Sequence, residues 1–238
     1  MIKKEVNNLD KEIEKINAAK ASLEEIKDGM VIGIGSGSTV AKLIELLGKK
    51  VKDEGLDLLT VPTSYQVQQL LVDSGIPITS LDEHPDLDIA IDGADEVDKN
   101  LNLIKGGGAA LTQEKIVDSA ANRLIIIVDS GKLVDNLGEK FPVPIEVIPM
   151  ALPLVKKRLR KYTENFKLRM AVKKLGPVVS DNGNFIIDAQ ISDLKDRDLK
   201  DLEKNLNAIP GIVENGLFIN MTDTVYVGEG KGARKITK

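Results

Sequence analysis

Apolar positions in the first 130 residues alternate between helical and strand-like spacing. Leu9, Ile13, Ile16, Leu23 and Ile26 recur at steps of three, four and seven, which predicts an amphipathic helix ending near residues 28–29. Further predicted strands cover residues 30–34, 56–61, 87–91 and 123–128, and further predicted helices cover residues 39–47, 65–74 and 110–121. Strands that alternate with helices in this way indicate a parallel sheet with helices on both faces.

The pattern changes after residue 130. Residues 141–153 contain four prolines, which cannot continue a helix, so we interpret them as a crossing between domains. A compact α+β set follows, with predicted helices at 154–162 and 194–206, strands near 166–172, 178–179 and 185–188, and a turn at 181–183. Residues 211–227 hold short apolar runs that we expect to return to the first sheet. Residues 228–238 are interpreted as a solvated basic tail.

The predicted fold class is therefore α/β with two domains. We expect a Rossmann-like parallel-sheet domain over residues 1–130 and 208–238. A smaller α+β domain of the ferredoxin-like type is expected over residues 131–207.

Composition narrows the function. The chain has 33 basic and 37 acidic residues among 238, and the formal charge of −4 gives no global attraction to nucleic acid or to an anionic membrane. The absence of cysteine excludes disulfides and thiolate chemistry, and His84 is the only histidine, which disfavours a serine-histidine triad or a multi-histidine metal site. The sequence has no apolar run typical of a secretory signal or a membrane span, so we expect a cytoplasmic protein.

The segment GIGSGST at residues 33–39 lies between a predicted strand and a predicted helix. Backbone N–H groups are unpaired at such a position, and the helix dipole favours an anion. Glycines let a phosphate approach the backbone, and Ser36, Ser38 and Thr39 add hydroxyl donors. We interpret the segment as a phosphate-binding turn. The alternative is a glycine-rich turn that only packs strand against helix.

Two nucleotide-binding motifs do not fit this turn. No Gly-Lys-Ser/Thr follows, as a P-loop requires, and Ser38 stands where the dinucleotide motif has its third glycine. The second predicted strand ends in Val-Pro-Thr-Ser at residues 61–64, without the acidic residue that holds a ribose. We therefore expect no nicotinamide cofactor.

Residues 92–115 follow a buried-looking strand, at the edge where open α/β sheets bind their ligands. The segment begins DGADEVD at residues 92–98, continues with Lys105 and three glycines, and reaches Glu114 in the first turns of a predicted helix. Carboxylates beside a lysine can exchange protons, and consecutive glycines can turn N–H groups toward one point, as an oxyanion site requires. The alternatives are a solvated turn capped by Asp92 and Asp95, or a magnesium site, although Lys105 would compete with a metal.

Together these segments resemble the A-type ribose-5-phosphate isomerase family. The resemblance is carried by GSGST at 35–39, DGADE at 92–96 and KGGGAALTQEK at 105–115, and it continues through VDSGK at 128–132, FPVPIEVIPM at 141–150 and DNGN at 181–184. It spans nearly the entire chain. It implies interconversion of D-ribose 5-phosphate and D-ribulose 5-phosphate in the pentose phosphate pathway, without metal or coenzyme.

The resemblance also implies particular site residues. The implied substrate contacts are Ser36, Gly37, Ser38, Thr39, Asp92, Gly93, Ala94, Asp95, Lys105, Gly106, Gly107, Gly108 and Lys132. Lys15 aligns, by its distance from the glycine turn, with a family lysine near the phosphate, and the alternative for it is a solvated lysine. The chain departs from the family where Ser36 replaces a more usual threonine. Residues 63–66 also differ from the family's serine-rich loop, which leaves substrate contacts there open.

The chemistry of aldose-ketose isomerisation fits these residues. The reaction needs a base between C2 and C1, donors for the enediolate oxygen, an acid-base pair to open the furanose ring, and a phosphate handle. Glu114, which matches the family's general base, is assigned the first role. Lys105 and the glycines after it are assigned the second. Asp92 and Asp95 are assigned the ring opening, and the division of work between them stays open.

Other functions on a related α/β scaffold are sugar-phosphate deaminases, CoA transferases and sugar-phosphate sensors. A deaminase is expected to use histidine-assisted ring opening, whereas we interpret His84 as a surface loop residue. A non-catalytic sensor would keep the phosphate-binding turn without needing Lys105 and Glu114. As partners we expect a pentose 5-phosphate and, from the resemblance, a second copy or three further copies of the chain in a homodimer or homotetramer.

Overall fold

The computed structural model describes residues 2–238, with side chains described from residue 9 onward. Its contacts form two compact units. The first comprises the chain up to Ala94, then Gln113–Lys132 and Met221–Lys238, and the second comprises Asp95–Thr112 and Leu133–Asn220. Residues 95–112 and 208–220 thus make most of their contacts in the second unit, whereas the sequence analysis placed them in the first domain. The predicted domain ranges stay a prediction.

The first unit is built on a sheet with the strand order β13-β12-β6-β3-β1-β2. Its strands are β1 (Val31–Ile34), β2 (Leu59–Pro62), β3 (Ile89–Asp92), β6 (Leu124–Asp129), β12 (Thr224–Glu229) and β13 (Gly232–Thr237). Neighbouring strands from β2 to β12 are parallel, and β13 pairs antiparallel with β12. Parallel strands need crossover connections, which helices supply here.

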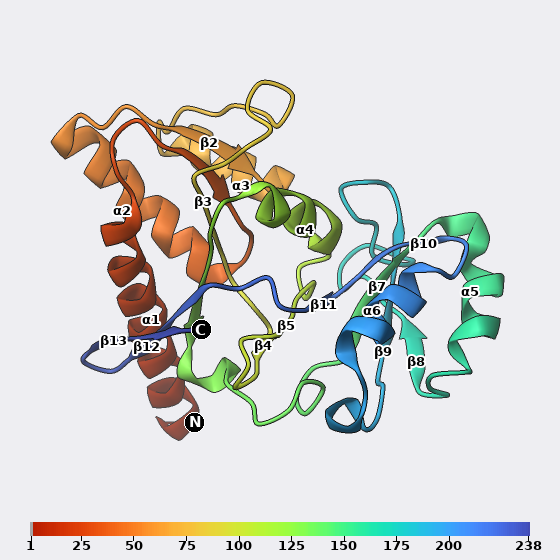
Figure 1. Cartoon of the computed structure of the whole chain (residues 1–238). Helices are drawn as coiled ribbons and strands as arrows, with labels where there is room; N and C mark the ends of the chain where they lie inside the picture. The colour runs from red at the N-terminus through yellow and green to blue at the C-terminus, as the bar shows by residue number, and fades with distance from the viewer. Residues whose placement is uncertain (1) are drawn as a thin grey trace. The chain divides into compact units, whose positions relative to one another are not determined.

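Helices cover both faces of this sheet. They are α1 (Ile2–Ser22), the short 3₁₀ turn η1 (Leu23–Glu25), α2 (Ser38–Glu54), α3 (Tyr65–Asp73) and α4 (Leu111–Ala120). Alternate strand residues such as Ile32 and Ile91 pack with α1, α2 and α3 in one core, while Val117 of α4 packs with Val61 and Leu87 in another. Figure 1 shows α1 and α2 side by side along the sheet. The predicted parallel sheet with helices on both faces is confirmed.

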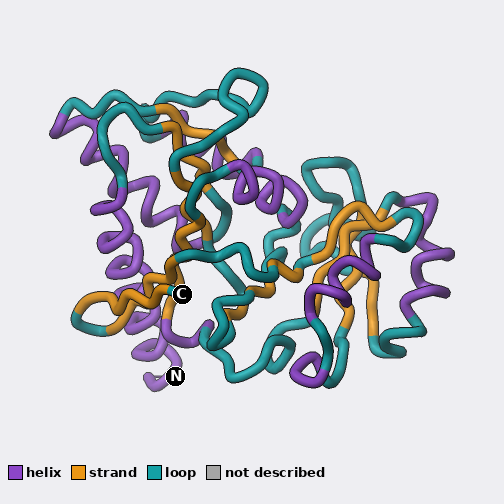
Figure 2. The backbone as a smooth tube through the Cα atoms, viewed as in Figure 1, coloured by secondary structure: helices purple, strands orange, loops and turns teal. Residues whose placement is uncertain are grey.

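The expectation of a solvated basic tail is wrong. Residues 232–237 form β13, which pairs with β12 from Thr224↔Thr237 to Glu229↔Gly232. Figure 2 shows this hairpin as two orange strands that end near the C-terminus. An edge strand leaves one row of its polar groups open to solvent, and Arg234 and Lys235 are typical of such an edge. Most of the basic residues at 228–238 therefore belong to an edge strand and its turn, and their charge does not indicate a solvated tail.

The second unit contains a ferredoxin-like βαββαβ arrangement, as predicted. Its elements are β7 (Val143–Val147), η3 (Pro149–Ala151), α5 (Leu152–Leu159), β8 (Phe166–Leu168), β9 (Phe185–Ala189), η4 (Leu194–Asp196), α6 (Leu199–Asn207) and β10 (Ile212–Asn215). The antiparallel sheet has the order β10-β7-β9-β8. Both helices pack on it through an apolar core that includes Val155 and Leu206.

A small antiparallel sheet with the order β11-β5-β4 also belongs to the second unit. Its strands are β4 (Glu96–Val97), β5 (Leu103–Ile104) and β11 (Leu217–Phe218). Glu96 is fully buried and accepts hydrogen bonds from the backbone N–H groups of Gly138, Lys140 and Phe141 at 2.6, 2.5 and 2.7 Å. A buried carboxylate is tolerable here because its charge is met by several donors.

Residues 141–153 are not a crossing between domains, because residues 143–147 form the interior strand β7. Pro144 is accommodated at the end of the pairing between β7 and β10, where its carbonyl accepts from Gly216 at 2.7 Å. Proline has no backbone N–H to donate but keeps its carbonyl, so it fits where the neighbouring strand donates an N–H to it. The four prolines therefore do not mark a break between domains here.

No helix among the described residues is long and apolar enough to cross a membrane.

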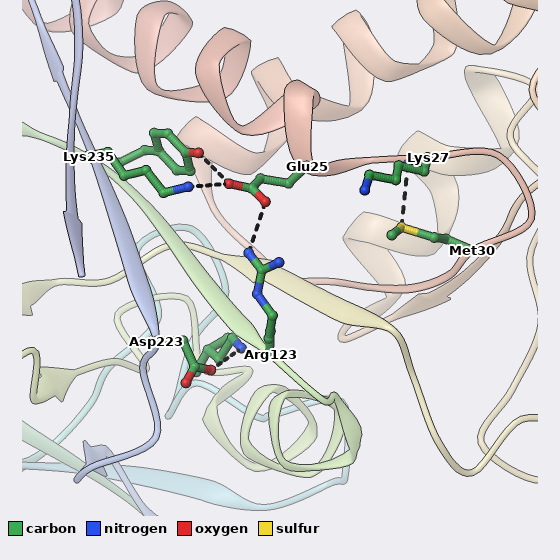
Figure 3. Close-up of polar contacts among 8 residues, drawn as sticks. Glu25, Lys27, Met30, Arg123, Asp223 and Lys235 are labelled. Carbon is green, nitrogen blue, oxygen red and sulfur yellow. Dashed lines mark hydrogen bonds and ion pairs between the residues drawn. The ribbon is translucent and has the colours of Figure 1, made fainter. Parts of the chain in front are cut away.

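Glu25 fastens the edge of the first sheet. Its carboxylate accepts hydrogen bonds from Tyr226 Oη at 2.5 Å, Lys235 Nζ at 2.7 Å and Arg123 Nη2 at 2.9 Å (Figure 3). The side chain of Glu25 is 14% exposed, and those of Arg123 and Lys235 are about half exposed. The hydrogen bonds from Lys235 and Tyr226 lower the pKa of Glu25 from its ordinary 4.5 to about 2.

This lowered pKa predicts a pH-dependent stability. Because the folded pKa lies below the unfolded one, the contribution is complete above pH 4.5 and is lost as pH falls toward 2. Glu25→Gln should lower the free energy of unfolding by about 2 kcal/mol at pH 7, a figure discounted for the exposed partners. Urea unfolding of the parent and of Glu25→Gln between pH 7 and pH 3 measures the difference in their unfolding free energies, which should become smaller as the pH falls. A difference that does not change with pH would contradict the prediction.

Candidate active site

The glycine turn lies between β1 and α2, as predicted. Gly35 N–H donates to the Ile91 carbonyl at 2.9 Å, and Gly37 caps α2 with φ +113°, a conformation that favours glycine. Ser38 and Thr39 form the first turn of α2, where Ser38 is exposed and Thr39 is buried. The turn therefore presents the start of a helix, with the N–H groups that favour an anion.

Asp92 fixes the turn to the end of β3. Its Oδ1 accepts from Ser36 N at 3.0 Å and from Gly93 N at 2.6 Å, and the residue is fully buried. A Cβ atom on Gly35 would overlap the Asp92 carboxylate, so this close approach requires glycine. Asp92 thus has a structural task in addition to the chemical one assigned to it.

A hydroxyl cluster that the sequence did not predict lies beside the turn. Ser36 Oγ lies 2.8 Å from Thr63 Oγ1 and donates to Ser64 Oγ at 2.9 Å. Ser64 also caps α3, because its Oγ accepts from Val67 N at 3.2 Å. Serine ahead of a predicted helix was a readable signal for the cap. The contacts of Thr63 and Ser64 with Ser36 have no local sequence signal, since 27 and 28 positions separate the partners.

Glu114 lies on the buried side of α4, 4% exposed. Helix α4 lies close to β1, because a Cβ on Gly33 would come 2.7 Å from Val117 Cγ1. The residues around Glu114 include Lys115 and Asp118, both buried. A carboxylate placed at the start of a helix and shielded from water is suited to proton transfer at carbon.

Two lysines that the resemblance implied also belong to the first unit. Lys132 ends the short turn η2 (Ser130–Lys132), directly after β6, and is half-buried. Lys15 on α1 donates to Glu12 Oε1 at 2.7 Å, and Lys42 Nζ of α2 lies 3.6 Å from Glu12 Oε2. The hydrogen bond from Lys15 lowers the pKa of Glu12. Lys15 thus forms an ion pair within α1, and its partner Glu12 also joins α1 to α2 through Lys42.

In the second unit, Lys105 and its glycines follow β5. Lys105 is 2% exposed, its N–H donates to the Gly216 carbonyl at 2.9 Å, and its Nζ lies 5.4 Å from the centre of the Phe218 ring. Gly107 N donates to Asp95 Oδ2 at 2.7 Å. Asp95 therefore binds the glycine loop directly, and an aromatic face meets the ammonium of Lys105.

Glu146 on β7 is a second residue that the sequence analysis missed. Its fully buried carboxylate accepts from Thr112 Oγ1 at 2.5 Å, Ser180 Oγ at 2.7 Å, Asn184 Nδ2 at 2.9 Å and Asn182 Nδ2 at 3.1 Å. Thr112 lies in the first turn of α4, so Glu146 ties that turn to the 181–184 loop. A lone acidic residue in an apolar strand was the available signal.

The structure distributes the predicted residues over both units. The first unit holds Ser36, Gly37, Ser38, Thr39, Asp92, Gly93, Ala94, Glu114 and Lys132, and the second holds Asp95, Lys105, Gly106, Gly107 and Gly108. Direct contacts join Ser36, Asp92 and Gly93 in the first unit, and Asp95 with Gly107 in the second. Among the side chains that the structure describes, from residue 9 onward, no three histidine or acidic groups are placed to hold a metal ion. His84 lies in a loop, as expected, and is half-buried.

A glycine turn before α2 and buried acidic groups near the strand ends are typical of α/β enzymes that act on phosphorylated substrates. Comparison with known proteins is more specific. A family model described as ribose 5-phosphate isomerase A (phosphoriboisomerase A) matches residues 59–232. The chain belongs to this family, as the resemblance indicated, and is accordingly an isomerase.

Curated relatives and solved structures agree over nearly the whole chain. The ribose-5-phosphate isomerase A of Pyrococcus abyssi is 52% identical over 95% of this chain and 98% of its own, and that of Thermococcus kodakarensis is 51% identical over 92% and 96%. A solved D-ribose-5-phosphate isomerase in complex with phospho-erythronic acid has 50% identity and a TM-score of 0.92, covering 96% of this chain and 99% of its own. The enzyme from Methanocaldococcus jannaschii has 47% identity and a TM-score of 0.90, covering 94% and 98%.

Proposed function

We propose that this protein interconverts D-ribose 5-phosphate and D-ribulose 5-phosphate, through an enediolate and without a metal or coenzyme. The observation that carries the proposal is the buried carboxylate of Glu114 on α4, in a chain of the isomerase family. Glu114 removes the proton from C2 of the open-chain aldose and returns it to C1, while the hydroxyl proton moves from O2 to O1. The reverse sequence converts the ketose to the aldose.

The other residues have separable roles. The turn of Ser36, Gly37, Ser38 and Thr39 binds the phosphate through backbone N–H groups and hydroxyls, with the Lys132 ammonium as a further charge. Lys105 and the N–H groups of the glycine loop stabilise the negative oxygen of the enediolate. Binding of the remote phosphate then helps to orient the reacting carbons.

Asp92 and Asp95 open the sugar ring and move hydroxyl protons in this proposal. The two are placed differently. Asp92 holds two backbone N–H groups of the first unit with one carboxylate oxygen, and Asp95 holds Gly107 N of the second unit. The contacts of Asp92 give it a fixed position that its replacement would disturb, so we assign Asp95 the larger share of proton movement.

One assay tests the function. Protein treated with a chelator and then dialysed should convert ribose 5-phosphate to ribulose 5-phosphate, and added Mg²⁺ should leave the rate unchanged. Absence of turnover would refute the isomerase proposal. Activity that disappears with the chelator and returns with Mg²⁺ would instead support a metal-assisted reaction.

The cellular setting belongs to the same proposal. We place the enzyme in the cytoplasm, in the non-oxidative pentose phosphate pathway, as a homodimer or homotetramer. Analytical ultracentrifugation distinguishes these two assemblies from a monomer.

A further inference from the structure

One peptide unit of the glycine loop is held at both ends. Arg169 Nη1 donates to the Gly106 carbonyl at 2.8 Å, and Asp95 Oδ2 accepts from the N–H of the same peptide unit, that of Gly107, at 2.7 Å. The same Arg169 nitrogen also donates to the Gly107 carbonyl at 3.0 Å. A run of three glycines has no side chains to fix it, so these contacts define its shape.

Arg169 is itself fixed by Asp188. Its Nε donates to Asp188 Oδ2 at 3.0 Å and its Nη2 to Asp188 Oδ1 at 2.5 Å, which is a bidentate ion pair. The side chains are 14% and 11% exposed, so water competes little for them. Asp188 belongs to β9, and Arg169 N donates to the Ile186 carbonyl of the same strand at 2.8 Å. The guanidinium is therefore held rigidly by the ferredoxin-like sheet.

The direction of each carbonyl that Arg169 holds also determines the direction of the N–H group in the same peptide unit. In a trans peptide the C=O and N–H point to opposite sides, and the described chain has no cis peptide bond. Because the Gly107 carbonyl points at Arg169, the N–H of Gly108 points away from it. A cation at the carbonyl end also polarises the peptide, which strengthens its N–H as a donor.

We propose that Arg169 and Asp188 are positioning residues for the isomerisation. They hold the glycine loop so that the Gly108 N–H is presented to the enediolate oxygen. The inference rests on the proposed function, because the enediolate is its intermediate. Neither residue was singled out by the sequence, where Arg169 is one charged position in a stretch predicted as a strand.

Kinetics of Arg169→Met, Arg169→Lys and Asp188→Asn test this proposal. A loop displaced by a fraction of an ångström should lower kcat by about 10–100-fold. The KM for ribose 5-phosphate and the inhibition constant of inorganic phosphate should stay within about 3-fold of the parent values, because the phosphate-binding turn belongs to the first unit. Arg169→Lys should retain more activity than Arg169→Met, since it keeps the charge but loses the fork that binds Asp188.

Two further measurements separate positioning from simple destabilisation. Affinity for phospho-erythronic acid, whose carboxylate mimics the enediolate charge, should fall in step with kcat. Arg160→Met is the matched control, because Arg160 makes an exposed ion pair with Glu164 at 3.4 Å, and it should leave all constants unchanged. A folded Arg169→Met enzyme with parental kcat would overturn the proposal, as would equal losses of phosphate and phospho-erythronic acid binding.

Failure of the proposed function would be seen separately, as a parent protein without turnover. In that case amide exchange by NMR still tests whether Arg169 holds the glycine loop in place. The Gly107 N–H should exchange at least about 10-fold faster in Arg169→Lys than in the parent. An unchanged exchange rate would show that Arg169 does not hold the glycine loop. Should Arg169→Met fail to fold, Arg169→Lys and Asp188→Asn supply the same comparisons.

Discussion

Replacement of Glu114 by glutamine is expected to lower kcat by about 10³-fold or more, with little change in KM. Glutamine keeps the size of the side chain and removes the proton acceptor, and general acid-base catalysis contributes about 10²–10⁴-fold. The proposed phosphate contacts lie elsewhere in the first unit, so ground-state binding should survive. The measurement is the initial rate of ribulose 5-phosphate formation over a range of substrate concentrations.

Proton exchange at carbon sharpens this test. In D₂O the parent should incorporate deuterium from solvent at the carbon next to the carbonyl, and Glu114→Gln should lose this exchange along with turnover. Glu45→Gln is the matched control, because Glu45 is exposed and pairs with Lys49 at 2.9 Å on α2. Persistent exchange in Glu114→Gln would assign the base to another residue.

Gly35→Ala should damage both stability and activity. The new Cβ would overlap the Asp92 carboxylate, so either Asp92 leaves its two N–H donors or the backbone of the turn moves. Loss of two charge-assisted hydrogen bonds in a buried place corresponds to about 2–4 kcal/mol of unfolding free energy. Displacement of the proposed phosphate-binding turn should lower kcat/KM by about 10²-fold. Urea unfolding and initial rates measure the two effects.

The chain offers a control and a direct check of the cause. Gly230→Ala introduces a Cβ with no neighbour within 4 Å, so it should leave stability and kcat/KM near the parent values. In an Asp92→Ala background, Gly35→Ala should cost much less stability, because the overlapping carboxylate is gone and the two changes are coupled. Additive losses in the double variant would show that the clash with Asp92 is not the reason.

The elements that the sequence predicted correctly are those with local signals. The helix at 65–74 and the strand at 123–128 match α3 and β6 closely, because apolar periodicity reports which face an element buries. The ferredoxin-like type of the second unit was also predicted, but its first strand, β7, and its last strand, β10, were not. One error has a distant cause, because β7 accommodates Pro144 through Gly216, 72 residues later in the chain. The other is local: β13 forms a hairpin with β12, and its basic residues had been interpreted as a solvated tail.

The candidate site divides in the same way. The glycine turn at 33–39, the acidic run from Asp92 and the lysine with its glycines are contiguous segments, so the sequence by itself determined them and the family they define. Only the tertiary structure decided that Asp92 braces the turn, that Glu146 holds Thr112, and that Arg169 holds the glycine loop. These contacts join residues 34 to 63 positions apart. No local pattern encodes a hydrogen bond between segments that meet only when the sheets have formed.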